Sequence, residues 1–217
     1  MAAKVDLVFI MLSDKVAIDA VLVPEFWEQM SKKIVVNMST IAPLESLALE
    51  KIAQKHQATY LEAPVSGSVG AAKAGALLIL AAGEKEVVAQ LKPVLAHLGS
   101  QIFYLGKIGQ GAGAKLSINS FLAQMGVAYS EALLLAKHLG VDAELFLQII
   151  GQSGMNSPLF QAKKGMWLQD SYPAAFSLKL MLKDIRLANN EAGEAMKLPF
   201  LSKAQELYPT STKNSVL

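Results

Sequence analysis

The chain has 217 residues, and at about 150 residues per domain this length fits one large domain or two small ones. Apolar residues make up 53% of the chain and charged residues 18%, against a usual charged share of about 25%. This composition excludes a disordered chain and predicts a large buried core. The formal net charge of +2 is too small to indicate a nucleic-acid-binding surface, so we expect no nucleic-acid partner.

The chain contains no cysteine, which excludes disulfides, thiolate metal sites and a cysteine nucleophile. The histidines are isolated and lack metal-ligand spacing, so we expect no metal site. The longest run without a polar residue, 74–83, is about half as long as a membrane helix, and no signal peptide is visible. We therefore expect no membrane partner and a cytoplasmic location, with mitochondria left open if an upstream segment exists.

The first half of the chain alternates strand-like and helix-like segments. Residues 5–12 form a nearly continuous apolar run, which is typical of a strand buried on both faces of a sheet. Further strands are predicted at 34–37, 59–62, 76–82 and 101–105, and helices at 15–30, 43–54, 66–73 and 84–97. This alternation is typical of a parallel, helix-covered sheet with one antiparallel excursion.

The pattern becomes helical after Gly106, where a glycine-rich stretch leads into a long predicted helix over 114–138. Shorter helices are predicted at 142–150, 157–165, 176–192 and 199–208. The sequence thus predicts an α/β domain over 1–107 and an all-α domain over 108–217 that begins with the long interdomain helix.

Polar groups follow the first two predicted strands. Met11, Leu12 and Ser13 lie at the carboxyl end of the first strand, and Ser39 and Thr40 follow the second. Because the carboxyl ends of parallel strands border the usual ligand crevice of such sheets, these segments are candidates for ligand binding. They also fit ordinary caps of the helices that follow, and the local pattern leaves this alternative open.

A second candidate is the turn that contains Ser66 and Gly67, after the strand over 59–62. Backbone N–H groups exposed by such a turn can hold a carboxylate or a phosphate, aided by the partial positive charge of a helix N-terminus. A plain turn between a strand and a helix fits equally well.

Two lysines are candidates for chemistry. Lys115 and Asn119 lie four residues apart, and therefore on one face of the long predicted helix. An ammonium group there could exchange a proton with a substrate oxygen if burial lowers its pKa from about 10.4. Lys183 belongs to a charge cluster that fits either a solvated helix face or a lysine aimed into an interdomain cleft. For both lysines, an ordinary surface position remains the alternative.

Three segments together closely resemble the β-hydroxyacid dehydrogenase family. They are 62–75 (EAPVSGSVGAAKAG), 106–119 (GKIGQGAGAKLSIN) and 183–190 (KDIRLANN). The resemblance extends over residues 5–208. It implies a partial Rossmann-type parallel sheet followed by an all-helical domain for substrate binding and dimerisation.

The resemblance also implies an activity and its residues. The protein would be an NAD- or NADP-dependent oxidoreductase, which interconverts a small β-hydroxyacid and its semialdehyde or oxo acid by hydride transfer. Lys115 would be the catalytic acid and base, while Ser66, Gly67 and Asn119 would bind the carboxylate-bearing substrate. The cofactor would be bound by Met11, Leu12, Thr40 and Lys183. Substrate specificity would depend on residues near 155–160 and on Phe176.

The chain departs from the family pattern at three residues. Ser68 replaces the second glycine of the usual SGG, which could shift substrate preference. Glu62 replaces an aspartate, and Asn190 stands where an acidic residue is common; we expect little from these two changes.

A larger departure is an absence. Family members bind the cofactor pyrophosphate with a GxGxxG turn, and the 217 residues contain no such turn. We expect the first mononucleotide-binding half to be missing, which leaves the choice between NAD and NADP open. We also note that relatives continue beyond Tyr208. The strand over 5–12 would then be a hydrophobic edge, which another chain covers or a longer protein completes.

Two other functions remain open. A non-catalytic relative could use the scaffold for oligomerisation or partner binding, and an imine reductase could share it. Lys115 argues against both, because the first has no chemical need for a lysine there and the second usually carries another residue. The long helix is apolar around much of its circumference, so we expect a homodimer or homotetramer.

Overall fold

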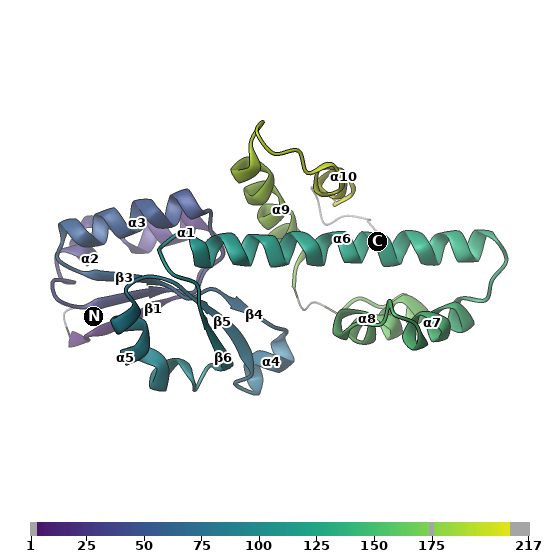
Figure 1. Cartoon of the computed structure of the whole chain (residues 1–217), viewed down its shortest axis with the longest axis horizontal. Helices are drawn as coiled ribbons and strands as arrows, with labels where there is room; N and C mark the ends of the chain where they lie inside the picture. The colour runs from purple at the N-terminus through teal and green to yellow at the C-terminus, as the bar shows by residue number, and fades with distance from the viewer. Residues whose placement is uncertain (1–3, 174–175, 209–217) are drawn as a thin grey trace.

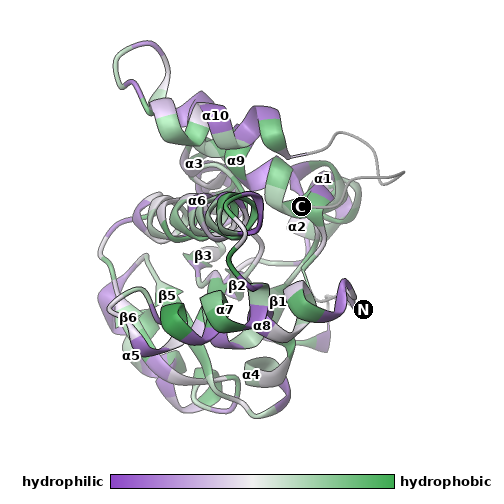
Figure 2. Ribbon diagram, turned by 90° about the vertical axis from the view of Figure 1, so that its right-hand side faces the viewer, coloured by the Kyte–Doolittle hydropathy of each residue, from purple (hydrophilic) through white to green (hydrophobic). Residues whose placement is uncertain are grey.

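The computed structural model describes residues 4–173 and 176–208 (Figure 1). A sheet region lies at one end of the molecule, and the long helix α6 (Gln110–His138) extends away from it. Figure 2 looks along α6, with α9 and α10 on one side of this helix and α7 and α8 on the other. The predicted order, an α/β sheet followed by a helical region, is confirmed.

The sheet has two parts. Strands β1 (Leu7–Ile10), β2 (Ile34–Asn37) and β3 (Thr59–Glu62) are parallel and neighbour one another in this order. The second part contains β4 (Val65–Ser66), β5 (Leu77–Ala81) and β6 (Gly99–Tyr104). Strand β4 is antiparallel to β5, and β6 is parallel to it, so the predicted antiparallel excursion is confirmed. An antiparallel bridge between Glu62 and Ala82 joins the two parts.

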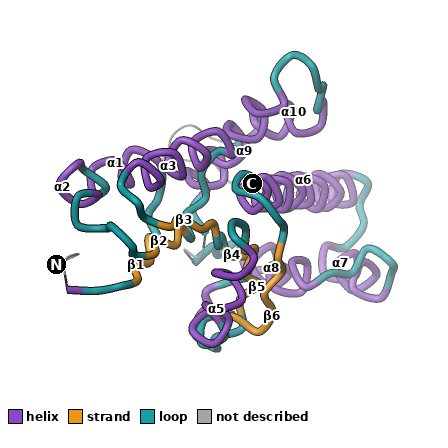
Figure 3. Tube along the Cα trace, turned by 60° about the vertical axis from the view of Figure 1, so that its left-hand side comes forward, coloured by secondary structure: helices purple, strands orange, loops and turns teal. Residues whose placement is uncertain are grey.

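Helices cover both faces of the sheet, as Figure 3 shows. Because side chains alternate along a strand, Val35 faces a core with Leu49 of α3, whereas Val36 faces a core with Leu91 of α5. The helices of this region are α1 (Lys15–Val21), α2 (Pro24–Trp27), α3 (Pro43–Lys55), α4 (Val69–Lys73) and α5 (Lys85–Leu95). Strand β1 lies at the edge of its sheet, with Phe9 37% exposed.

Several predicted helices have different limits in the structure, and three of these differences have a local cause. The helix expected over 15–30 is interrupted between α1 and α2, because the ring of Pro24 fits only the first turn of a helix. The helix expected from Ser66 begins at Val69, because Ser66 pairs with β5 instead. Helix α6 begins at Gln110 rather than at residue 114, for a reason that lies in the site described below.

The helical region is organised around α6, which has 29 residues and is therefore about 43 Å long. Its middle packs against α9 (Leu178–Ala192) and α10 (Pro199–Leu207), with Ala123 and Ile185 in the shared core. Its last turns pack against α7 (Ala143–Gln152) and α8 (Pro158–Gln169). None of the described helices, α6 included, has a stretch long and apolar enough to cross a membrane.

Candidate active site

The loops after β1 and β2 lie side by side, because Ile10 pairs with Asn37 at the ends of the two parallel strands. The Leu12 N–H donates to Ser39 Oγ over 2.8 Å, which ties one loop to the other. Buried Asn37 supports this arrangement: its Oδ1 accepts from the Ser39 N–H, and its Nδ2 donates to the Tyr60 hydroxyl. The carboxyl ends of the two strands, where ligand binding is predicted, therefore rest on a buried polar network that sequence reasoning missed.

Lys183 connects these two loops with the helical region. From α9, its ammonium group donates to the carbonyl oxygens of Ser13 over 2.8 Å and Thr40 over 2.6 Å. Of the four predicted cofactor residues, the structure joins Lys183 directly to Thr40. The loop that carries Leu12 is joined to both, whereas the side chain of Met11 is 63% exposed.

Lys115 and Asn119 form the centre of a second network, in the first turns of α6. The Lys115 ammonium donates to Asn119 Oδ1 over 2.9 Å, so the predicted pairing on one helix face is present. The Asn119 Nδ2 donates to Asp184 Oδ2 over 2.6 Å, and Lys183 Nζ lies 3.0 Å from Asp184 Oδ1. Asn119 and Asp184 are both buried. Asp184 thus orients the Asn119 amide, with its oxygen toward the lysine.

The environment of Lys115 changes its proton affinity. Burial lowers the pKa of the Lys115 ammonium below its usual value, because a charged group loses hydration there. The carboxylate of Asp184 opposes this decrease, and the nearby charge of Lys183 adds to it. Lys115 therefore releases its proton more readily than a solvated lysine does.

The turn at Ser66 and Gly67 lies near the start of α6, because this helix packs against β4. Gly67 has a φ of +151°, and a Cβ atom there would lie 2.8 Å from Leu77 Cδ2, so a side chain at this position would be strained. Ser68 caps α4 by accepting a hydrogen bond from the Ala71 N–H. Among the described residues, no hydrogen bond links Lys115 to this turn.

Glu62 fixes the start of α6, a role that sequence reasoning missed. This buried carboxylate, at the end of β3, accepts the N–H groups of Gly109 and Gly111 over 2.9 Å each and that of Ala112 over 3.2 Å. Such bonds satisfy donors that every helix N-terminus leaves free. Because Gly109 has no capping side chain, the helix needs an acceptor from elsewhere. In the sequence, the lack of a capping side chain at Gly109 was the signal that an acceptor from another segment caps this helix.

Close packing accompanies these bonds. A Cβ atom on Gly111 would lie 2.8 Å from the Leu80 carbonyl oxygen and 2.9 Å from Glu62 Oε2, so only glycine allows this approach. The bonds explain why α6 begins before residue 114: the glycines become helical once a carboxylate binds their N–H groups. Burial raises the pKa of the Glu62 carboxyl, and the hydrogen bonds from Ser46 and the helix N-terminus oppose this increase.

The described residues contain no cluster of three histidine or acidic side chains that could hold a metal ion. The site offers an amine of lowered pKa and an oriented amide, connected through Lys183 to two loops at the carboxyl ends of strands.

Comparisons with known proteins agree with this arrangement. Residues 1–106 match the family described as the NAD binding domain of 6-phosphogluconate dehydrogenase. Residues 109–216 match the family described as NAD-binding of NADP-dependent 3-hydroxyisobutyrate dehydrogenase. The two matches together span nearly the whole chain.

Individual relatives of the chain include semialdehyde reductases and 3-hydroxyisobutyrate dehydrogenases. The chain is 35% identical over 210 residues to glyoxylate/succinic semialdehyde reductase 2 of Arabidopsis thaliana, covering 95% of this chain and 59% of that protein. It is 33% identical over 184 residues to mitochondrial 3-hydroxyisobutyrate dehydrogenase of Bos taurus, covering 81% and 54%. The chain thus spans little more than half the length of these relatives.

A solved structure has the same fold. The 3-hydroxyisobutyrate dehydrogenase of Mycobacterium tuberculosis with L-serine superposes with a TM-score of 0.85 and 26% identity, covering 95% of this chain and 74% of that one. The three motifs, the two domain matches and these relatives lead to one conclusion. The chain belongs to the β-hydroxyacid dehydrogenase family.

Proposed function

We propose that the protein is an NAD(P)-dependent oxidoreductase that interconverts a small β-hydroxyacid and its semialdehyde or oxo acid. One observation carries this proposal: the partly buried amine of Lys115 is held by Asn119 in a network that reaches the loops after β1 and β2. Two of the motifs, 106–119 and 183–190, meet in this network, which reaches the carboxyl ends of the strands, where an α/β sheet binds ligands.

The residues at these loops suit one end of a dinucleotide cofactor. Met11 offers an exposed apolar side chain, and the loop carbonyls of Ser13 and Thr40 offer polar contacts near Lys183. They would hold the nicotinamide and its ribose, whereas the 217 residues contain no GxGxxG turn for the pyrophosphate. NAD(P), when bound, supplies or accepts the hydride.

Lys115 would move the proton. In reduction its ammonium donates a proton to the substrate carbonyl oxygen, and in oxidation the neutral amine takes the hydroxyl proton. The lowered pKa favours exchange nearer to neutral pH. A cation beside a developing alkoxide also stabilises the transition state, and more so where water is excluded.

The substrate carboxylate would lie at the turn of Ser66 and Gly67, bound by the hydroxyl and by backbone N–H groups. Packing of α6 against β4 supports this placement, because it brings the turn close to the helix that carries Lys115. The names of the relatives, which include glyoxylate, succinic semialdehyde and 3-hydroxyisobutyrate, point to substrates of this size and charge.

Replacing Lys115 tests the proposal. We expect Lys115→Met to reduce the rate of glyoxylate- or succinic-semialdehyde-dependent NADH and NADPH oxidation by about 10²- to 10⁴-fold. The far-ultraviolet circular dichroism spectrum should stay unchanged. Lys107→Met is the matched control, because Lys107 is exposed and lies just before the same helix. Unchanged turnover in Lys115→Met would remove the assignment of this residue.

A non-catalytic scaffold is the second candidate function. The observation that favours it is the exposed apolar surface along α6, which includes Leu134 and Leu139. Wild-type protein that forms stable oligomers but neither binds NADH or NADPH nor reduces either aldehyde would favour the scaffold over the enzyme.

A further inference from the structure

A chain of hydrogen bonds between buried polar side chains connects several elements of the sheet region. At one end, the Leu12 N–H in the loop after β1 donates to Ser39 Oγ over 2.8 Å, and the Ser39 N–H donates to Asn37 Oδ1 over 3.0 Å. The chain continues from Asn37 Nδ2 to the Tyr60 hydroxyl over 3.0 Å, and from there to Ser46 Oγ over 2.9 Å. These polar side chains are all buried. The bonds thus lead from the loop after β1, through β2 and β3, to α3.

The far end of this chain determines which group donates each hydroxyl proton. Ser46 also hydrogen-bonds to the carboxylate of Glu62, a bond that opposes the effect of burial on the pKa of that carboxyl. A carboxylate only accepts hydrogen bonds, so Ser46 uses its one hydroxyl proton there. The Tyr60 hydroxyl must then donate to Ser46, which leaves the Tyr60 oxygen to accept from Asn37. Each hydroxyl therefore donates once and accepts once, and the chain ends at the carboxylate that caps α6.

Such a chain contributes geometry more than stability. Tyr60 belongs to the same apolar core as Val35 and Leu49, where an unpaired hydroxyl group is unfavourable. Replacing both partners of a buried polar pair by apolar groups can be nearly neutral for stability, whereas a fully paired network specifies one arrangement. A displacement at either end of the chain would leave a buried group unpaired, so the two ends are held at a fixed separation.

The two ends hold different parts of the proposed reaction. Leu12 lies in the loop that would contact the nicotinamide, from which the hydride comes. Glu62 binds the N–H of Gly111, about one helical turn before Lys115, which would move the proton. Hydride and proton must reach the two bonded atoms of one carbonyl group, so the separation of their donors matters. A misplacement of about 1 Å can reduce the rate of such a reaction by about 10²-fold.

A second connection, through α9, holds α6 on the other side of Lys115. It runs from the loops after β1 and β2 through Lys183 and Asp184 to Asn119, about one turn after Lys115. The buried chain ends instead at 109–112, before Lys115. Because a helix held at one point can still tilt about that point, both connections are needed to fix the position of the ammonium group.

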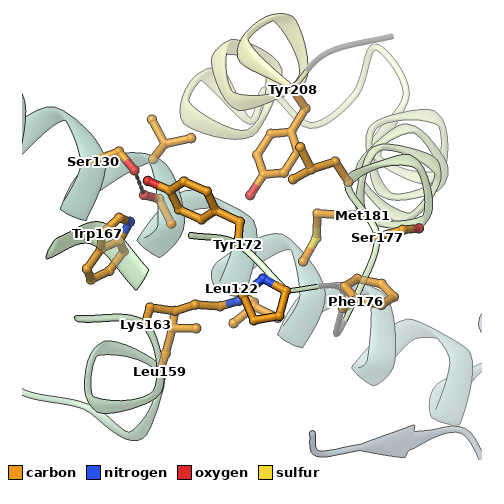
Figure 4. Close-up of a pocket in the computed structure, with 14 residues that line it drawn as sticks. Leu122, Ser130, Leu159, Lys163, Trp167, Tyr172, Phe176, Ser177, Met181 and Tyr208 are labelled. Atoms are coloured by element: carbon orange, nitrogen blue, oxygen red, sulfur yellow. Dashed lines mark hydrogen bonds between the residues drawn. The ribbon is translucent and has the colours of Figure 1, made fainter. Parts of the chain in front are cut away.

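Helix α6 also forms a wall of a pocket of about 360 Å³, which Figure 4 shows. Leu122 of α6 lines this pocket together with Phe176, one of the residues on which substrate specificity would depend. Leu122 follows Lys115 by seven residues, or about 10 Å along the helix. A tilt at the start of α6 would therefore move Lys115 and this pocket wall together, and the buried chain opposes such a tilt.

We propose that Tyr60 and Ser46 are positioning residues of the oxidoreductase, a role that rests on the proposed function. Their hydroxyl groups join the loop that would carry the nicotinamide to the helix that carries Lys115. They thereby keep the proton donor at a fixed distance from the hydride donor. Both side chains are buried within the sheet region, so they act through the loop and the helix and not by contact with the substrate.

Kinetics of hydroxyl-deleted variants test the proposal. Tyr60→Phe keeps the ring, and we expect it to reduce kcat for glyoxylate or succinic semialdehyde by about tenfold, with less than about a twofold change in the aldehyde KM. Ser46→Ala should have the same effect, and the double variant should lose no more than Tyr60→Phe alone, because either change interrupts the same chain. Tyr104→Phe is the matched control. Tyr104 is exposed and donates to the Gly83 carbonyl, so this variant should keep the wild-type kcat.

Exchange of backbone N–H groups, measured by NMR, tests the positioning without turnover. Tyr60→Phe should raise the exchange rates of the Leu12 and Gly111 N–H groups, at the two ends of the chain, by about fivefold. The N–H of Val36, in the central strand β2, should exchange as in the wild type. An equal increase at all three groups would show a loss of global stability alone and would overturn the proposal.

Two kinetic outcomes separate this role from the proposed function. Wild-type kcat in Tyr60→Phe, beside an inactive Lys115→Met, would overturn the positioning role and leave the proposed function in place. Full additivity of the losses in Tyr60→Phe and Ser46→Ala would also overturn it, because the two hydroxyls would then act separately. No turnover of either aldehyde by the wild-type chain would remove the proposed function itself, and the positioning role with it.

Discussion

The two ends of α6 differ in what surrounds them. In the first turns, Gly111, Leu116 and Asn119 are buried, and carboxylates from β3 and α9 bind the helix. In the last turns, Leu135 and Leu139 are 58% and 68% exposed, although α7 and α8 pack against the opposite face. One continuous helix is therefore fixed by buried polar bonds at one end and presents apolar side chains to solvent at the other.

This difference separates two tasks. Hydrogen bonds of defined direction hold a side chain in one orientation, which proton transfer at Lys115 requires. Apolar contact is less directional and depends on buried area, which suits association with another chain. We therefore infer that the first turns of α6 serve chemistry, while its last turns serve assembly into the homodimer or homotetramer that the sequence predicts.

The largest expected effect concerns the start of α6. Glu62→Ala removes the acceptor for three N–H groups, two of them in buried hydrogen bonds, and we expect it to lower the free energy of unfolding by about 2–4 kcal/mol. Glu62→Gln, which keeps one oxygen acceptor, should lower it less. Urea denaturation measures both variants. A decrease below about 0.5 kcal/mol for Glu62→Ala would mean that other contacts fix this helix end.

The next effect concerns the orientation of Asn119. Asp184→Ala removes the acceptor of the Asn119 amide, so we expect a loss of turnover of about tenfold or more. Because the Asp184 carboxylate opposes the decrease in the Lys115 pKa, its removal should lower that pKa further. The pH dependence of Lys115 acylation reports this shift, which a purely structural role would not produce. Glu191→Gln is the control, an exposed carboxyl on the same helix, and it should leave the profile unchanged.

A smaller effect follows from Lys115 alone. Because its pKa is lower in the folded than in the unfolded chain, the unfolded chain binds more protons between the two values. Wild-type stability relative to Lys115→Met should therefore rise as the pH increases through the folded pKa toward the ordinary value of 10.5. Denaturation at a series of pH values checks the sign. A difference that falls with pH would contradict burial as the dominant cause.

The smallest effect on stability is expected at the far end of α6. Leu135→Lys combined with Leu139→Lys should change the free energy of unfolding of the separate chain by only about 0.5 kcal/mol, because both side chains are exposed. The same pair should dissociate the oligomer, as measured by sedimentation velocity. Val16→Lys, at a 79% exposed residue of α1, is the control and should leave assembly intact. If the wild-type chain is a monomer, the last turns of α6 do not serve assembly.

Local pattern predicts much of the fold. The strands at 34–37 and 59–62 agree with the structure to the residue, because β-branched and apolar runs between turn residues are a local signal. The spacing of Lys115 and Asn119 predicted their contact, since residues four apart meet on any helix. The continuous helix predicted over 15–30 was wrong, because a helix begins anew at Pro24. This break follows from a local rule, since proline fits only the first turn of a helix.

Contacts between distant segments could not be predicted in this way. The spacing within a motif says nothing about which residue of another motif lies opposite, and Asp184 lies 65 residues after its partner Asn119. Glu62 stands where the family has an aspartate, and we expected little effect from this change. Its carboxylate nevertheless binds the N–H of Gly109, 47 residues further on, at the start of α6. The buried Asn37 and Tyr60 pair likewise joins two strands.

The amino-acid sequence by itself determined the order of strands and helices, the family, and the residue types available for proton transfer and anion binding. These properties follow from periodicity, turn chemistry and short motifs, all of which act over a few residues. Only the tertiary structure decided which buried carboxylate caps α6, which one orients Asn119, and which loops Lys183 joins. A buried hydrogen bond takes its energy from the exclusion of water by the whole packed fold, so its partners are chosen by packing and not by neighbours in the chain.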